Sequence, residues 1–277
     1  MDTVSTNSSK LWQLIGLLPQ RPREFCNRVS AIVDSRVESY RHRPPRYETV
    51  PFDNLIQHLR TRLTADVDSI LGEDPLEQIK EEVSRGIRSL PSDAPFALHH
   101  NGDFSLAQLC YLLVRLMRPK AVVETGVCYG VTSAFLLQAL RVNGTGCLHS
   151  LDLPPLGKAG DDFVGWLIPQ DLRSNWRLHR GRSVDLLPDL VRQLGEIDIF
   201  LHDSLHTYRN MIREFEIVTP FLSAQSVVVA DDVEGNAAFK EWVAQSHPWY
   251  SAVLQEQSKQ SLLGVAMLGV QPPRQPQ

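Results

Sequence analysis

Four side chains that could perform chemistry follow two apolar, β-rich runs in the second half of the chain. Asp203 comes directly after IDIFLH and is followed by His206, while Asp231 and Asp232 come directly after SVVVA. If these runs are neighbouring parallel strands, three carboxylates meet at one sheet edge, where they repel one another unless a cation is present. Hard divalent cations such as Mg²⁺ bind oxygen ligands. The pattern predicts a Mg²⁺ site at Asp203, Asp231 and Asp232, although one of the paired aspartates could instead cap a helix.

His206 lies three residues after Asp203 and is expected to share its site. Imidazole titrates near neutral pH, so it can act as a general base. We predict that His206 accepts a proton from a substrate while Asp203 and its neighbours orient that substrate. The alternative is a packing role, in the core or beneath a cofactor.

A glycine-containing turn interrupts the stretch AVVETGVCYGVTS, residues 121–133. Gly126 and Gly130 would let the backbone turn tightly and approach a ligand. The middle glycine of the dinucleotide fingerprint G-x-G-x-x-G is missing, and no Gly-Lys-Ser/Thr of a P-loop follows. Glu124, at the strand end, would repel a pyrophosphate and suit a positively charged ligand. A simpler alternative is that Glu124 caps the next helix.

Asp152 ends the next β-rich run, CLHSLD, where a carboxylate can accept hydrogen bonds from a ribose diol. Dinucleotide sites use an acid in the same place, so Asp152 alone does not identify the ligand. Glu124 and the missing glycine favour S-adenosylmethionine, which carries an ammonium and a sulfonium and has no phosphate.

Short apolar runs alternate with helical stretches after residue 119, which predicts an α/β fold with a doubly wound, Rossmann-like sheet. The last two runs, YSAVLQEQ and LLGVAMLG, are too close for an intervening helix and predict an antiparallel strand at one edge of a seven-stranded, mostly parallel sheet. Ligands of such sheets bind at the carboxyl ends of the strands. Every residue singled out above falls at that edge.

The chain divides into four predicted regions: a tail over 1–10, a helical region over 11–94, the α/β domain over 95–270, and a tail over 271–277. Its 277 residues are 43% hydrophobic and carry a net charge of −4, so we expect no nucleic-acid partner. Four scattered cysteines without CxxC spacing fit a reducing compartment. We found no leader peptide or membrane span and expect a cytoplasmic protein.

The stretch VVETGVCYGVTSAFLLQAL, together with NGTGCLHSLDLP, resembles motif I and the second strand of class I S-adenosylmethionine-dependent methyltransferases. The likeness covers roughly residues 95–270. It implies that the glycine turn lines the methionine part of the cofactor, that Asp152 holds the ribose, and that Gly181-Arg182-Ser183 borders the adenine. The cofactor-binding residues it implies are Glu124, Gly126, Gly130, Ser133, Asp152, Ser183 and Asp203.

The acidic cluster is similar to that of metal-dependent O-methyltransferases of the catechol type and of the macrolide and aminocoumarin sugar type. The similarity implies that Asp203, Asp231 and Asp232 bind Mg²⁺, which holds two neighbouring hydroxyls of the acceptor. This sequence differs from both types at the position of the residue that would act as the general base. Leu205 stands where the sugar type has an aspartate, and His206 stands where the catechol type has a lysine.

The resemblance predicts metal-assisted O-methylation of a small-molecule hydroxyl, on a sugar or polyphenol of specialised metabolism. N-methylation of an amino-alcohol or amino sugar would suit the same cluster. Two other classes stay open, namely a hydroxylase or other redox enzyme on a related fold, and a non-catalytic binding module. The region 11–94 is expected to form a lid over the acceptor or a surface for homo-oligomerisation.

Overall fold

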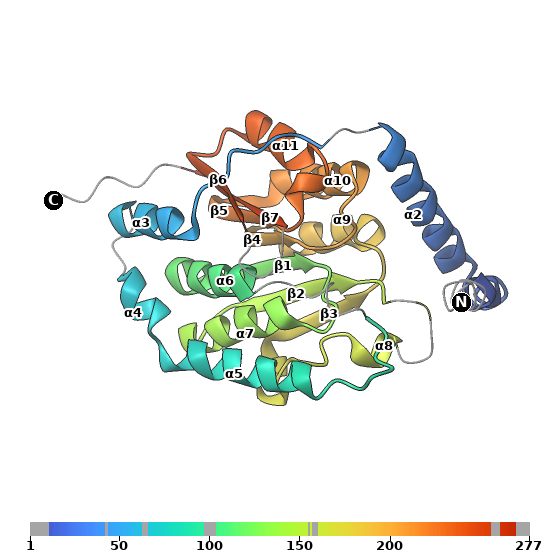
Figure 1. Ribbon diagram of the computed structural model, residues 1–277, viewed down its shortest axis with the longest axis horizontal. Coiled ribbons are helices and arrows are strands. Elements are labelled where there is room, and N and C mark those ends of the chain that lie inside the picture. The colour runs from blue at the N-terminus through green and yellow to red at the C-terminus, as the bar shows by residue number, and fades with distance from the viewer. Residues whose placement is uncertain are drawn as a thin grey trace.

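The computed structural model describes residues 11–41, 44–62, 66–96, 104–154, 156, 160–255 and 261–269. Its centre is a seven-stranded sheet with the order β3-β2-β1-β4-β5-β7-β6 (Figure 1). The strands are β1 (Ala121–Thr125), β2 (Cys147–Asp152), β3 (Trp176–Arg180), β4 (Ile197–His202), β5 (Leu222–Ala230), β6 (Tyr250–Gln255) and β7 (Leu262–Met267). The terminal tails predicted from sequence lie outside the described residues.

The predicted Rossmann-like fold class is confirmed. The first five strands pair in parallel, and β7 runs antiparallel between β5 and β6. The antiparallel strand, β7, therefore lies next to the outermost strand, β6, in the terminal hairpin that the sequence predicted at one edge of the sheet. This follows from chain length, because the few residues between β6 and β7 are too short for a helical crossover and permit only a hairpin.

Helices cover both faces of the sheet, which explains why the strands are apolar throughout rather than alternating. Val122 of β1 faces one helical layer, and its neighbour Val123 faces the other. The first layer contains α3 (Phe52–Arg62), α4 (Val67–Leu71), α5 (Asp74–Arg88), α6 (Phe104–Met117) and α7 (Val131–Asn143). The second layer contains α9 (Ser183–Leu194), α10 (Tyr208–Val218) and α11 (Ala238–Ser246).

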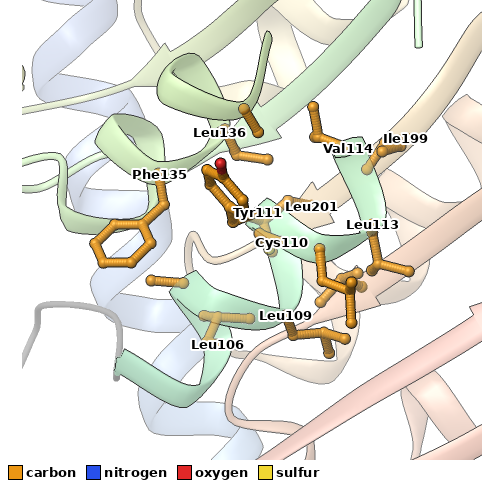
Figure 2. Close-up of a cluster of buried hydrophobic side chains, with 14 of the residues drawn as sticks. Leu106, Leu109, Cys110, Tyr111, Leu113, Val114, Phe135, Leu136, Ile199 and Leu201 are labelled. Atoms are coloured by element: carbon orange, nitrogen blue, oxygen red, sulfur yellow. The ribbon is translucent and has the colours of Figure 1, made fainter. Parts of the chain in front are cut away.

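Helix α6 contributes many side chains to the core cluster on one face of the sheet. Figure 2 shows Leu109, Cys110 and Tyr111 of this helix among side chains from α7 and β4. Because α6 is enclosed by the sheet and by other helices, nine of its residues are buried. This layer gives the strand ends a rigid support.

The region 11–94 supplies two different parts of the molecule. Leu55 of α3 and Ile79 of α5 are buried in the same cluster as the sheet residues. In contrast, α2 (Pro22–Arg41) lies at the carboxyl edge of the sheet (Figure 1), where the Asn27 side chain donates to Asp185 over 2.8 Å. Its role as a lid or oligomer surface remains a prediction.

The short elements are α8 (Gly160–Phe163), η2 (Gln170–Asn175), η3 (Thr219–Phe221) and η4 (Val233–Gly235), and residues 11–16 are helical. Within the described ranges, no helix is long and apolar enough to cross a membrane.

Candidate active site

A cavity of about 660 Å³ opens at the carboxyl ends of the parallel strands and extends beneath α2. The sequence-predicted residues that line it are Gly126, Asp152, Ser183, Asp203, His206, Asp231 and Asp232. Glu124, Gly130 and Ser133 are not among the described lining residues. The structure therefore brings most of the predicted site to one cavity and sets three residues apart from its surface.

Gly126 has a backbone that no other residue could adopt without strain. Its φ is +84°, and a Cβ there would lie 1.8 Å from the carbonyl oxygen of Asp203. The glycine therefore lets the turn after β1 contact the turn after β4. This contact places the predicted cofactor loop directly beside the acidic cluster.

Asp152 holds the glycine turn in place. Its Oδ2 accepts hydrogen bonds from the backbone N–H groups of Val127 at 2.7 Å and Cys128 at 3.0 Å. Burial raises the pKa of Asp152, and these hydrogen bonds and the nearby arginines Arg28 and Arg180 act in the opposite direction. One carboxylate thus shapes the loop and lines the cavity.

Glu124 lies almost fully buried behind the turn, and its Oε2 accepts from the hydroxyls of Ser133 at 2.8 Å and Ser150 at 2.7 Å. Burial raises its pKa to about 7, and the charge of Asp152 acts in the same direction, against the two serine hydrogen bonds. The hydroxyl of Ser133 is therefore engaged by Glu124. A cation arriving over this turn would favour the ionised form of Glu124.

Gly130 accommodates a neighbouring protein segment. Its φ is +87°, and a Cβ would lie 2.9 Å from both Gly165 and Ile168. The segment after α8 docks here, with Gly165 N–H donating to the Cys128 carbonyl at 3.0 Å. Close packing of this segment explains the glycine without any ligand contact.

The acidic cluster forms because β4 and β5 are neighbours. Asp231 N–H donates to the His202 carbonyl at 2.9 Å, so the turns after the two strands remain paired. The pKa of Asp203 lies well above its usual range because of burial and because of the charges of Asp231, Asp232 and Glu124. Among the described residues, we find no group of three or more histidines, cysteines, aspartates or glutamates whose side chains are arranged to hold a metal ion.

His206 lies between the acids. Its Nδ1 is 3.2 Å from the carbonyl oxygen of Asp231 and 3.7 Å from Asp232, and its Nε2 is 3.6 Å from Asp203 Oδ1. A carbonyl only accepts, so the hydrogen bond assigns the proton to Nδ1 and leaves the lone pair on Nε2. Burial, then the charge of His202, lowers the pKa of His206, although Asp232 and Asp231 act against this.

Glu214 of α10 is a site residue that the sequence reasoning missed. Its side chain is fully buried beneath the cavity and accepts hydrogen bonds from three strand-end turns. The donors are Thr125 Oγ1 (2.7 Å), His202 Nδ1 (2.7 Å), Ser204 Oγ (2.8 Å), Asn210 Nδ2 (3.0 Å) and Ser183 Oγ. The hydroxyl of Ser183, predicted to border the adenine, thus points to Glu214.

A local signal for Glu214 was present. The apolar face of α10 carries Met211, Phe215 and Val218, and Glu214 lies on the same face. An acid is rarely buried unless it is paired, so its position within an apolar stripe marks a buried polar centre. Burial by itself would raise the pKa of Glu214, but the attraction of His202 and the hydrogen bonds outweigh burial and lower it to about 2.

The sheet order, the glycine turn and the acid after β2 together define a Rossmann-like methyltransferase fold. Residues 123–233 match a family model described as a methyltransferase domain. This match supports the methyltransferase resemblance that the sequence indicated. No curated protein matches the chain.

Solved structures share the fold at low sequence identity. An O-methyltransferase from Bacillus cereus, in complex with SAH, has a TM-score of 0.50 and 16% identity, over 77% of this chain and 97% of that one. The O-methyltransferase TomG from Streptomyces achromogenes, involved in tomaymycin synthesis and in complex with SAM, has a TM-score of 0.50 and 18% identity, over 71% and 91%. At such identities, the likeness establishes the architecture.

Proposed function

We propose that this protein transfers the methyl group of S-adenosylmethionine to a hydroxyl group of a small molecule, with the help of a divalent cation. One observation carries the proposal: the glycine turn held by Asp152 and the group formed by Asp203 and His206 open into the same cavity. The fold shared with the O-methyltransferases from Bacillus cereus and Streptomyces achromogenes supports a hydroxyl as the acceptor group.

The residues for the two halves of the reaction are distinct. Asp152 would accept hydrogen bonds from the ribose, and the turn at Gly126 would lie against the methionine part. When bound, S-adenosylmethionine supplies an electrophilic methyl group on a sulfonium. His206 Nε2 would take the proton of the acceptor hydroxyl, so that its oxygen can attack the methyl carbon as the bond from sulfur breaks.

A divalent cation fits the donor chemistry of Asp203, Asp231 and Asp232. All three supply carboxylate oxygens, and burial, together with the charges of Asp231 and Asp232, raises the pKa of Asp203. When bound, such a cation would stabilise the ionised hydroxyl of the acceptor. The protein's own part is to hold the acids at adjacent strand ends and to keep His206 beside them.

The first test is a calorimetric titration of S-adenosylmethionine and S-adenosylhomocysteine into the native protein and Asp152→Ala. We expect saturable binding to the native protein and an affinity about 10- to 100-fold lower in the variant, because the charge-assisted hydrogen bonds to the ribose are lost. Asp162→Ala, an exposed acid in α8, is the matched control and should bind normally. Absence of binding by well-folded native protein would refute the proposal.

The cation is tested by thermal melting with Mg²⁺ and then with EDTA. We expect Mg²⁺ to raise the Tm of the native protein, since a ligand that binds only the folded state stabilises it by mass action. Asp231→Asn should lose this response while melting no lower without Mg²⁺, because one repelling charge is gone. Asp189→Asn, an exposed acid of α9, should respond like the native protein. An unchanged response in Asp231→Asn would place the cation elsewhere.

A further inference from the structure

The cavity has two chemically different walls. Asp203, Asp232 and His206 form the polar wall at the strand ends. The apolar lining includes Leu14 and Ile32 from the N-terminal region and Leu205 from the turn after β4. An acceptor whose hydroxyl reaches His206 therefore has hydrocarbon side chains around the rest of its body.

The cations at the cavity are already paired. Among the described lining residues, the only cationic ones are Arg28 and Arg182. Arg28 donates to Glu24 at 2.7 Å and to the Pro154 carbonyl at 2.5 Å, and Arg182 donates to Asp185 at 2.9 and 3.0 Å. A phosphate or carboxylate on the acceptor would therefore gain no new ion pair from these arginines and would lose water against the apolar lining, at a cost in binding free energy.

The apolar wall continues onto the surface. Ile32 lines the cavity and is still 45% exposed. Val29 and Val33 lie beside it along α2 and are 36% and 51% exposed. Neighbouring positions three and four residues apart share a helix face, so these side chains form an apolar strip leading out of the cavity.

We infer that the acceptor is a neutral, largely apolar hydroxylated molecule whose hydrocarbon part lies against Leu14, Ile32 and Leu205 and extends along this strip. The inference rests on the proposed function and names the acceptor class for the same site. We therefore expect phosphorylated acceptors, coenzyme A thioesters and free sugars to be poor substrates, because they are charged or strongly polar. Each methylene that becomes buried contributes about 0.8 kcal/mol, or about fourfold in affinity.

The probes are catechol and its 4-ethyl, 4-butyl and 4-hexyl derivatives, added to the protein with Mg²⁺. Affinity is measured calorimetrically on the complex with S-adenosylhomocysteine, and KM and kcat are measured with S-adenosylmethionine. We expect KM to fall by about fourfold per methylene until the strip is covered, with little change in kcat. The anion 3,4-dihydroxyphenylacetate should bind at least about tenfold more weakly than the similarly sized 4-ethylcatechol.

Ile32→Ser should weaken the dependence on chain length without changing the affinity for S-adenosylhomocysteine. Leu178→Ser is the matched control, because Leu178 of β3 is 40% exposed and is not a lining residue. A KM that does not vary with chain length, equal binding of the anion, or a free sugar with a higher kcat/KM than 4-hexylcatechol would overturn the inference.

The two proposals fail in different ways. If S-adenosylhomocysteine binds and no catechol in the series binds or turns over, the acceptor class is wrong and the cofactor assignment stands. If S-adenosylhomocysteine does not bind, the proposed function fails, and the acceptor class fails with it.

Discussion

Replacement of His206 by alanine is expected to lower kcat by about 10²- to 10⁴-fold, the usual contribution of a general base. The loss follows from geometry, since Nδ1 donates to the Asp231 carbonyl and Nε2 remains available for a proton beside Asp203. Binding of S-adenosylmethionine should change little, because Asp152 and the turn at Gly126, which are proposed to hold its ribose and methionine parts, follow other strands. The measurement is steady-state turnover with the best 4-alkylcatechol, alongside calorimetry of the cofactor.

The pH profile gives an independent readout of His206. A base works in its neutral form, and burial together with the charge of His202 lowers the pKa of His206. Native turnover should therefore rise with pH and level off below the usual histidine pKa of 6.5. His206→Ala should lose this rise and recover activity with added imidazole. His247→Ala, at an exposed histidine outside the cavity, should behave like the native enzyme. Full turnover with an unchanged profile in His206→Ala would exclude the base role.

Replacement of Glu214 by glutamine is expected to lower the free energy of unfolding by about 3–5 kcal/mol at pH 7, as for other broken buried ion pairs. The carboxylate is fully buried and accepts hydrogen bonds from the last residues of β1 and β4 and from Ser183, which follows β3. A glutamine amide cannot accept all of them and would place its own donor against donors. Chemical denaturation checks this value.

The sign of the pH effect is set by the lowered pKa of Glu214. Its value of about 2 in the folded state lies below the ordinary 4.5, so folding favours the ionised form. The stabilisation, about 3 kcal/mol, is complete above pH 4.5 and is lost as the pH falls toward 2. The difference in the free energy of unfolding between the native protein and Glu214→Gln should therefore become smaller as the pH falls from 4.5 toward 2.

Glu216→Gln provides the control for Glu214. Glu216 lies two residues further along α10 and is exposed, so the same chemical change should alter stability by no more than about 0.5 kcal/mol. Equal effects of the two substitutions, or a cost for Glu214→Gln that does not vary with pH, would contradict the role assigned to Glu214.

The sequence by itself determined the α/β architecture and the edge that carries the site. Apolar runs such as VVVA are continuous because helices cover both faces of the sheet, and this pattern is local enough to read from the chain. The residue at which each strand ends can also be recognised from a short segment of the sequence. Once the strands are parallel, Asp152, Asp203 and Asp231 must emerge at the same edge, whatever the details of packing.

Only the tertiary structure decided what each polar group at that edge contacts. Ser133 and Ser183 were predicted near the cofactor, but their hydroxyls donate to Glu124 and Glu214. Gly130 makes room for the segment at Gly165. These contacts join parts of the chain that are distant in sequence, and neither periodicity nor spacing encodes which of several nearby acceptors a hydroxyl will reach.

The placement of α2 shows the same limit. The sequence predicted a helical region here, yet nothing local indicated that Arg28 and Ile32 would line the cavity. That depends on long-range pairs such as Asn27 with Asp185 and Asp34 with Arg209. The sequence thus determined which elements form and where the strands end, because both are properties of short segments. The folded chain decided which side chains meet there, because those contacts arise only when distant segments pack together.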